Sequence, residues 1–427
     1  MIFFYRVLSI FFYPLLIILI FVRKFLKKEH PIRYKEKIFS SNFNIKKNKN
    51  LKLIWFHAAS IGELKSILPI IHALKKKDGL EFLITTVTLS SSDLASKIFK
   101  NDKNIFHRFF PLDSFFLMKT FLNSWKPNTI FLVDSEIWPN LIYLSKKSNI
   151  SLSIINARIT EKTFKRWKLF PKTAKKIFSS FDLCLASNNE SKDYLLNFNA
   201  NNVEYFGNIK FLSKIETIKT QNPNEKFLDE NNFWCAISTH KNEEKFCLEV
   251  HLKLMEKIKN LKIILAPRHI SRVYEIEKLC ERLKLSSQIL NNDEIISDSK
   301  DVIIINSFGN LNEFLVYAKS VFIGKSLIHK LKDDGGQNPI EPAKLGCKIY
   351  HGPYVYNFQE IYQILKINNI SKKIHDKDSL AKNLEIDLEK SNTKNSEKFS
   401  KLFNNLENDI LNATMKKIDN FLLNENS

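Results

Sequence analysis

From residue 51 onward, short apolar runs alternate with longer segments of helical periodicity, which limits the chain to few folds. Such alternation is typical of parallel sheets covered by helices on both faces. We expect strands over residues 51–57, 82–87, 105–110, 129–133, 152–156, 183–186 and 203–206, and a second series over 233–237, 261–266, 302–305, 320–323 and 348–351. The sequence therefore predicts an α/β protein with two doubly wound, Rossmann-like domains facing a cleft.

A polar stretch marks the boundary between the two series. Residues 213–231 contain Gln221-Asn222-Pro223-Asn224, which is typical of loops, and we interpret the stretch as a linker. At 427 residues the chain is also too long for one ordinary core. We predict an anchor over residues 1–28, a first domain over 29–211 and a second domain over 212–427. The polar, helical end of the chain is assigned to the second domain, with the alternative that it reaches back to the first.

The N-terminus is different in kind, because residues 7–22 are apolar apart from Ser9 and Tyr13. A helix of about 20 residues spans roughly 30 Å, the thickness of one hydrocarbon core. No small-residue cleavage site follows, so we favour an uncleaved anchor over a signal peptide. Basic residues follow at once, and the positive-inside rule places the rest of the chain in the cytoplasm: Arg23, Lys24, Lys27 and Lys28. A helix lying in the membrane interface is the alternative.

Lysine and arginine outnumber aspartate and glutamate by 66 to 45, giving a formal net charge of +21. This excess suggests an anionic partner such as nucleic acid, anionic lipid or a phosphorylated substrate. The lysines are scattered, however, whereas nucleic-acid-binding proteins gather them on one face, so we predict no nucleic-acid partner. The five cysteines are dispersed and the histidines lack metal-ligand spacing. We therefore predict neither a disulfide framework nor a metal site.

The turn after the first expected strand, His57-Ala58-Ala59-Ser60-Ile61-Gly62-Glu63-Leu64, carries a candidate catalytic group. An amphipathic helix pattern follows it, so Glu63 lies at a strand's carboxyl end and a helix start, where ligands bind in open α/β sheets. A carboxylate placed there can act as a general base. The alternative is that Glu63 only interacts favourably with the helix dipole.

Other candidate residues follow later strands. Asp134, Ser135 and Glu136 end one strand of the first domain, and Arg158 ends the next; they can orient a substrate or pair with each other. In the second domain, three loops offer groups that suit a phosphate, namely Ser238-Thr239-His240, Pro267-Arg268-His269 and Gly335-Gly336. Each loop alone also fits an ordinary cap or turn, but all three fall on one edge of one expected sheet.

Taken together, these stretches resemble the membrane-anchored 3-deoxy-D-manno-octulosonic acid (Kdo) transferases of lipopolysaccharide synthesis. The resemblance covers nearly the whole chain and is carried by residues 57–63, 135–140, 156–158, 207–211, 238–240, 267–269, 324–327, 335–342 and 352–358. It implies a GT-B glycosyltransferase at the inner membrane, with its catalytic domains on the cytoplasmic face. Its first domain would bind a lipid A precursor as the acceptor, and its second would bind CMP-Kdo as the donor. The resemblance further implies inverting transfer without a metal or other cofactor.

Residue by residue, the resemblance makes Glu63 the general base that deprotonates the acceptor hydroxyl. The acceptor side would comprise Ser60, Gly62, Glu136 and Arg158. The donor side would comprise Ser238, Thr239, His240, Arg268, His269, Gly324, Ser326, Gly335, Gly336, Asn338 and Glu341. We also expect Arg33, Lys35 and Lys37 to lie at the anionic lipid leaflet.

The chain departs from the family pattern at a few positions. Asp134 stands where a glutamate is usual, Ile270 where a proline is usual, and Asn306 and Asn310 where carboxylates are usual. None of them belongs to the Glu63 turn or to the Gly335–Gly336 loop, so we expect an active enzyme. The competing interpretation is another membrane-associated GT-B transferase that uses a different nucleotide sugar.

Overall fold

The computed structural model describes residues 2–43, 48, 50–215, 222–292, 294–307, 311–331, 335–389 and 396–424, so Asn310 lies outside the described residues. The chain divides into two compact units. The first unit comprises Met1–Lys214 and Leu406–Ser427, and the second comprises Ile215–Asn405. Our assignment of the whole C-terminal segment to the second domain is therefore wrong from Leu406 onward.

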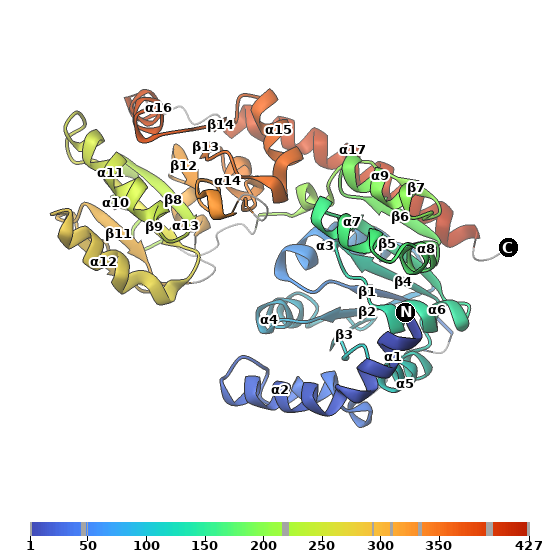
Figure 1. Ribbon diagram of the computed structural model, residues 1–427. Coiled ribbons are helices and arrows are strands. Elements are labelled where there is room, and N and C mark those ends of the chain that lie inside the picture. The colour runs from blue at the N-terminus through green and yellow to red at the C-terminus, as the bar shows by residue number, and fades with distance from the viewer. Residues whose placement is uncertain are drawn as a thin grey trace. The chain divides into compact units, whose positions relative to one another are not determined.

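The first unit is built around a parallel sheet of seven strands in the order β3-β2-β1-β4-β5-β6-β7, with helices on its faces (Figure 1). Its strands are β1 (Lys52–His57), β2 (Leu80–Thr86), β3 (Ile105–Phe109), β4 (Thr129–Val133), β5 (Ser151–Ala157), β6 (Leu183–Ala186) and β7 (Val203–Glu204). Its helices are α1 (Ile2–Phe11), α2 (Tyr13–Phe25), α3 (Ile61–Leu74), α4 (Leu89–Ile98), α5 (Phe115–Trp125), α6 (Pro139–Lys147), α7 (Glu161–Lys168), α8 (Pro171–Phe178) and α9 (Asn189–Asn197), with short 3-10 turns η1 (Arg33–Lys37), η2 (Ser40–Asn42) and η3 (Ile209–Leu212). The order reverses between β1 and β4, which makes their carboxyl ends the expected ligand site.

The second unit repeats this plan in the order β10-β11-β9-β8-β12-β13-β14, with the reversal between β8 and β12. Its strands are β8 (Phe233–Thr239), β9 (Lys262–Pro267), β10 (Ser287–Leu290), β11 (Val302–Ile305), β12 (Ser320–Ile323), β13 (Lys348–His351) and β14 (Ser371–Lys373). Its helices are α10 (Glu225–Glu230), α11 (Glu243–Met255), α12 (Val273–Arg282), α13 (Asn312–Leu315), α14 (Ile340–Lys344), α15 (Gln359–Ile367) and α16 (Lys377–Glu389), with turns η4 (Ile270–Arg272), η5 (His329–Leu331) and η6 (Tyr356–Phe358). Two doubly wound α/β units are thus confirmed.

The last helix, α17 (Ser396–Asn424), packs against the first unit over its C-terminal part. A Cβ atom added to Gly207 would lie only 2.6 Å from Ile410 Cγ1, so the helix approaches the chain closely there. Ion pairs join Lys417 to Glu204 and Lys77 to Asp419. The alternative that the chain end reaches back to the first domain is therefore confirmed.

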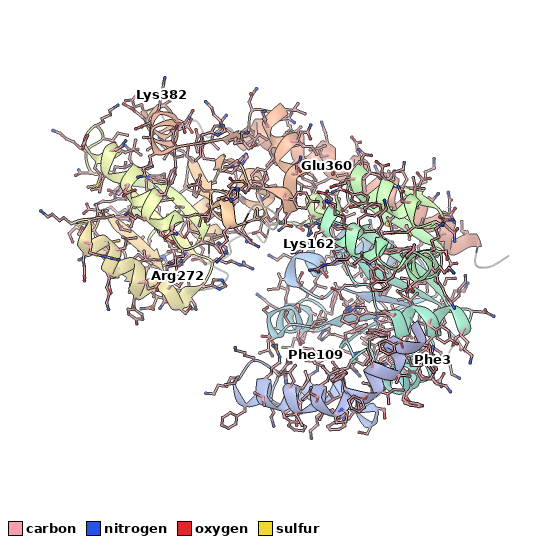
Figure 2. All side chains as sticks on the ribbon, in the orientation of Figure 1. Phe3, Phe109, Lys162, Arg272, Glu360 and Lys382 are labelled. Atoms are coloured by element: carbon pink, nitrogen blue, oxygen red, sulfur yellow. The ribbon has the colours of Figure 1, made fainter. Side chains whose placement is uncertain are left out.

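The apolar N-terminus forms two helices, α1 and α2, rather than one. Among the described residues, no single helix is both long and apolar enough to cross a membrane, but the pair Phe3–Phe11 and Tyr13–Phe25, bent by 53°, passes that test together. Many of its large apolar side chains are exposed, including Phe3, which Figure 2 labels.

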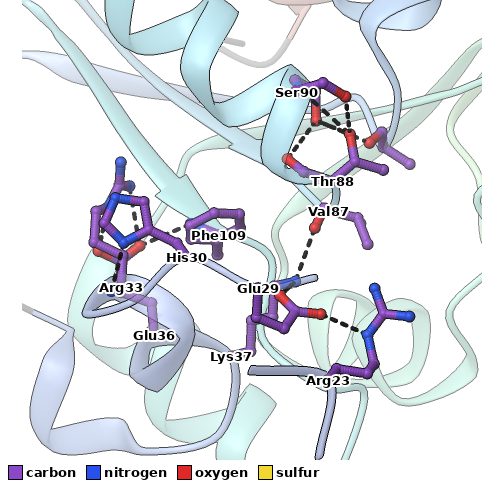
Figure 3. A network of polar contacts seen from close by, with 12 residues as sticks. Arg23, Glu29, His30, Arg33, Glu36, Lys37, Val87, Thr88, Ser90 and Phe109 are labelled. Carbon is purple, nitrogen blue, oxygen red and sulfur yellow. Dashed lines mark hydrogen bonds and ion pairs between the residues drawn. The ribbon is translucent and has the colours of Figure 1, made fainter. Parts of the chain in front are cut away.

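A buried polar network ties the end of α2 to the sheet (Figure 3). Glu29 accepts hydrogen bonds from Arg23 and from Lys37, and Lys37 also donates to the Val87 carbonyl at 2.8 Å. Lys37 is only 4% exposed. Our expectation that Lys37 lies at the lipid leaflet is therefore wrong, because its charge is neutralised by Glu29 inside the protein. Arg33 likewise pairs with Glu36 and donates to the His107 carbonyl.

Candidate active site

Glu63 lies at the start of α3, directly after β1 and therefore at the reversal point of the first sheet. Ser60 is the N-cap of α3, and its side chain accepts a hydrogen bond from the Glu63 N–H. In return, the Glu63 carboxylate accepts hydrogen bonds from Ser60 Oγ at 2.8 Å and from the Ala59 N–H at 2.7 Å. These reciprocal bonds resemble a capping box, with the Ala59 N–H in place of the N-cap N–H, and they hold the carboxylate in one position.

The surroundings of Glu63 also favour proton uptake. Burial raises the pKa of Glu63 to about 7, and the negative charges of Asp134 and Glu136 add to the rise against the lowering effect of its hydrogen bonds. A general base is most effective when its pKa is near the working pH. The helix-capping and catalytic interpretations of Glu63 are thus compatible. Gly62 is exposed, and a Cβ there would meet nothing within 4 Å, so the space beside the helix start is open.

A chain of hydrogen bonds positions Glu136 beside this turn. Glu136 Oε2 lies 2.8 Å from the Trp138 Nε1 donor and 3.2 Å from His57 Nε2. On its other side, His57 Nδ1 lies 2.9 Å from the Thr85 hydroxyl, which accepts a hydrogen bond from Trp55 Nε1. His57 Nδ1 also lies 3.2 Å from the Thr85 carbonyl oxygen, and since an ionised carboxylate only accepts, His57 Nε2 is the donor to Glu136. His57 is fully buried and stacks on Phe110, so the network is rigid.

The other acidic group, Asp134, is held by a basic residue from far along the chain. Lys210 Nζ lies 2.6 Å from Asp134 Oδ2, and both side chains are mostly buried. Asp134 has a φ of +63°, an uncommon conformation for a residue other than glycine. The Arg158 N–H donates to the Asp134 carbonyl, which brings the ends of β4 and β5 together. A basic residue thus pairs with the acidic stretch, and the sequence did not identify Lys210 as that partner.

In the second unit, a buried carboxylate organises the equivalent edge of the sheet. Glu243 is fully buried and accepts hydrogen bonds from four backbone N–H groups, those of His240, Lys325, Ser326 and Leu327, at 2.7–3.0 Å. It thereby joins the loop after β8 to the loop after β12, on either side of the reversal. Sequence reasoning missed Glu243 because a first-turn glutamate is usually a solvent-exposed helix residue.

Three predicted donor residues have structural roles in this edge. The Ser326 hydroxyl is buried, donates to the Ile323 carbonyl at 2.6 Å and accepts from the Gly352 N–H at 2.9 Å. Its one donor is thus in use and the side chain is fully buried, so Ser326 holds the loop after β12 in place, and its predicted contact with the donor stays untested. The Gly336 N–H donates to the Lys325 carbonyl at 2.6 Å, so it is not available to a phosphate as we expected. At Gly324 a Cβ would lie 2.5 Å from the Ser238 carbonyl oxygen, so close packing requires the glycine.

Other predicted donor residues are more accessible. Arg268 and His269 are exposed, and the Arg268 N–H donates to the Thr239 carbonyl. His240 is half-buried, and its ring lies 5.9 Å from that of His269, edge to face. Burial lowers the pKa of His240. These side chains lie together beyond β8 and β9, where an anion could meet them.

The remaining predicted donor residues lie nearby in the same unit. Ser238 has a φ of +52°, and the Thr239 hydroxyl is buried without a hydrogen-bond partner. Asn338 accepts a hydrogen bond from the Ile340 N–H, while Glu341 lies partly exposed in the first turn of α14. No group of three or more potential metal-ligating His, Cys, Asp or Glu side chains occurs among the described residues. That finding leaves the predicted independence from metal untested.

Comparison with known proteins shows which family this chain resembles. The family described as 3-deoxy-D-manno-octulosonic-acid transferase (kdotransferase) matches residues 33–213. A probable mitochondrial 3-deoxy-D-manno-octulosonic acid transferase of Arabidopsis thaliana is 30% identical over 356 residues, which cover 77% of this chain and 76% of the relative. The corresponding enzyme of Haemophilus influenzae is 29% identical over 323 residues, covering 73% of each chain.

Solved structures support the fold independently. A glycosyltransferase from Rickettsia africae superposes with a TM-score of 0.56 at 12% identity, covering 87% of this chain and 99% of that one. At this level of identity the likeness shows a shared GT-B architecture and no more. The sequence relatives carry the functional conclusion: this chain belongs to the Kdo transferase family of glycosyltransferases.

Proposed function

We propose that this enzyme transfers Kdo from CMP-Kdo to a lipid A precursor of the lipid IVA type, with inversion at the anomeric carbon and Glu63 as the general base. The observation that carries the proposal is the Glu63 carboxylate, which is fixed by Ser60 and Ala59 and has its pKa raised to about 7 at the reversal point of the first sheet. The family supports Kdo as the transferred sugar.

In the proposed reaction, an acceptor hydroxyl attacks the anomeric carbon of Kdo from the face opposite the phosphate. Its proton passes to Glu63, the new glycosidic C–O bond forms, and the bond to the CMP oxygen breaks. Glu136, whose Oε2 accepts from both His57 and Trp138, would use its other oxygen to orient the acceptor. Arg268 would neutralise charge on the leaving CMP, in a reaction without a metal.

The direct test is transfer by purified protein with CMP-Kdo generated in situ and a tetra-acylated lipid A precursor, followed by mass spectrometry. Glu63→Gln should lower the rate by about 10²–10⁴, the usual contribution of a general base. Glu190→Gln is the matched control, because Glu190 is also a first-turn residue, of α9, but is exposed. The mass of the product also reports how many Kdo residues are added.

Two outcomes would contradict the proposal. Full activity of Glu63→Gln would remove Glu63 as the base. Failure with CMP-Kdo together with transfer from a UDP-sugar would support the alternative donor.

We also propose that the enzyme works at the inner membrane, with both catalytic units on the cytoplasmic side and anionic lipids as partners. The exposed apolar side chains of α1 and α2, followed by the exposed Lys27 and Lys28, support this location. Apolar surface of this extent is favourable only when something other than water covers it.

A further inference from the structure

One face of the helix pair α1 and α2 already packs against the first unit. Tyr13, Ile17 and Ile20 follow each other at helical spacing, and Ile17 and Ile20 pack against Tyr34, Ile38 and Leu112 of the first unit. The opposite face is exposed and apolar from Phe3 to Phe25, and includes Phe11, Leu15, Ile18 and Val22. The pair is therefore attached along its length to the protein and presents the other side outward.

The few polar residues of α1 all point toward the protein. The Tyr5 hydroxyl donates to the fully buried Asp113 carboxylate at 3.1 Å. The Arg6 guanidinium lies over the Phe115 and Tyr143 rings, at 4.3 and 4.2 Å from their centres. Ser9 Oγ accepts a hydrogen bond from Asn140 at 3.2 Å. The start of the helix pair is thus joined to α5 and α6.

The end of the helix pair is joined to the same unit by charged groups. Arg23 Nε lies 2.7 Å from Glu29, which also pairs with the buried Lys37 (Figure 3). Lys24 Nζ lies 4.7 Å from the centre of the Tyr34 ring. Polar contacts therefore hold the pair at both ends, with apolar packing between them.

This double attachment conflicts with a membrane-crossing orientation. From Tyr5 to Arg23 the chain rises about 27 Å along its two helix axes, and somewhat less end to end because the pair is bent by 53°, which is comparable with the roughly 30 Å of a hydrocarbon core. If the pair crossed the bilayer, Asp113 and Asn140 would lie near one surface and Glu29 and Lys37 near the other. The surface of the folded unit between them would then sit in hydrocarbon, where each charged group costs several kcal/mol.

We propose that α1 and α2 do not cross the membrane but lie together in the plane of its cytoplasmic leaflet, with the inner face docked on the first unit. The inference rests on the membrane location proposed above. The outer apolar face would enter the boundary between headgroups and acyl chains. The exposed Lys27 and Lys28, at the end of this face, match anionic headgroups, which favours a lipid surface over a second copy of the chain as the occupant.

The orientation also concerns the active site. Asp113 accepts hydrogen bonds from the N–H groups of Asn140 and Leu141, at the start of α6. That helix begins directly after Glu136 and Trp138. A helix pair held in the leaflet by its outer face would thus keep the Glu136 carboxylate at a fixed height above the lipid surface.

The test uses two outward-facing positions, one at each end of the pair. Phe3→Cys and Phe25→Cys replace side chains that are 74% and 88% exposed, and the five native cysteines are all buried. Each purified full-length variant is labelled with a nitrobenzoxadiazole fluorophore and added to preformed, sealed vesicles of phosphatidylethanolamine and phosphatidylglycerol. Dithionite is then added outside, because it bleaches fluorophores only in the outer leaflet. Retained transfer activity serves as the control for folding.

We expect both labels to be bleached completely before any detergent is added. Protection of the Phe3→Cys label until detergent is added, with the Phe25→Cys label bleached, would mean that the pair crosses and would overturn the inference. Failure of either variant to bind vesicles, with the chain dimeric in solution, would overturn both the inference and the membrane location. Kdo transfer measured in detergent is independent of these results, so the proposed reaction can fail or succeed separately.

Discussion

The raised pKa of Glu63 implies that this residue makes the folded protein less stable at neutral pH. Its ordinary pKa is 4.5, and in the folded protein it is about 7, so the folded state binds the proton more tightly than the unfolded state. Ionisation therefore opposes folding. At 1.36 kcal/mol per pKa unit, the penalty is about 3 kcal/mol at pH 8, falls to about 1 kcal/mol at pH 5, and disappears below the unfolded pKa.

Replacing Glu63 with glutamine should remove this penalty with little loss of hydrogen bonding. The amide oxygen can accept from the Ala59 N–H, and the amide nitrogen can donate to Ser60 Oγ, the two partners that the carboxylate uses now. Glu63→Gln is therefore expected to be inactive yet more stable than the natural enzyme. The gain should be roughly 2–3 kcal/mol at pH 8 and about 1 kcal/mol or less at pH 5.

Urea unfolding at pH 5 and pH 8, followed by tryptophan fluorescence, measures this difference. Four of the five tryptophans lie in the first unit, so the signal reports mainly on the domain that contains Glu63. Glu190→Gln provides the control, because Glu190 is also a first-turn glutamate but is exposed. A Glu63→Gln protein that is less stable at pH 8, or a difference independent of pH, would refute the reasoning.

Three further predictions concern other parts of the two units. Asp134→Asn removes a negative charge that raises the pKa of Glu63, so the acid limb of the pH–rate profile of kcat/KM should move to lower pH; an unmoved limb would contradict this. Glu243→Ala leaves four backbone N–H groups without an acceptor and should destabilise the protein by about 3–5 kcal/mol in thermal unfolding. A loss below about 1 kcal/mol would mean that Glu243 does not hold the two loops together. Gly207→Ala places a Cβ 2.6 Å from Ile410 Cγ1 and should lower the free energy of unfolding by about 1–3 kcal/mol. Adding Ile410→Ala should restore part of this loss, and strictly additive effects in a double-mutant cycle would argue against the contact.

The alternation of apolar runs was sufficient to predict two doubly wound sheets, because strands buried on both faces leave a strong hydrophobic signal. Two strands, β10 and β14, were missed. They lie at opposite edges of the second sheet, and Ser287–Ile289, Lys372 and Lys373 are not buried. An edge strand buries fewer side chains, so its sequence resembles a loop.

The position of Glu63 between a strand and a helix could be predicted from the sequence, but the residues that pair with the nearby Asp134 and Glu136 could not. Lys210 meets Asp134 because η3 packs against α3 and the Ile209 N–H donates to Asn156 of β5, so positions far apart in the chain come into contact. The buried Ser326 and Lys37 show the same limit. A small polar residue after a strand, or a lysine near an apolar helix, has the same sequence signature whether it is exposed or buried.

The return of α17 to the first unit means that the chain completes its N-terminal domain last. During synthesis, the second unit emerges whole before Ile410, Asp419 and Phe421 are available to Gly207, Lys77 and Phe131. The domain that carries Glu63 must therefore wait on the ribosome with part of its surface uncovered, while a domain encoded after it can already fold. A stop codon that removes only the final twenty or so residues would then injure the unit that carries Glu63 and spare the second unit.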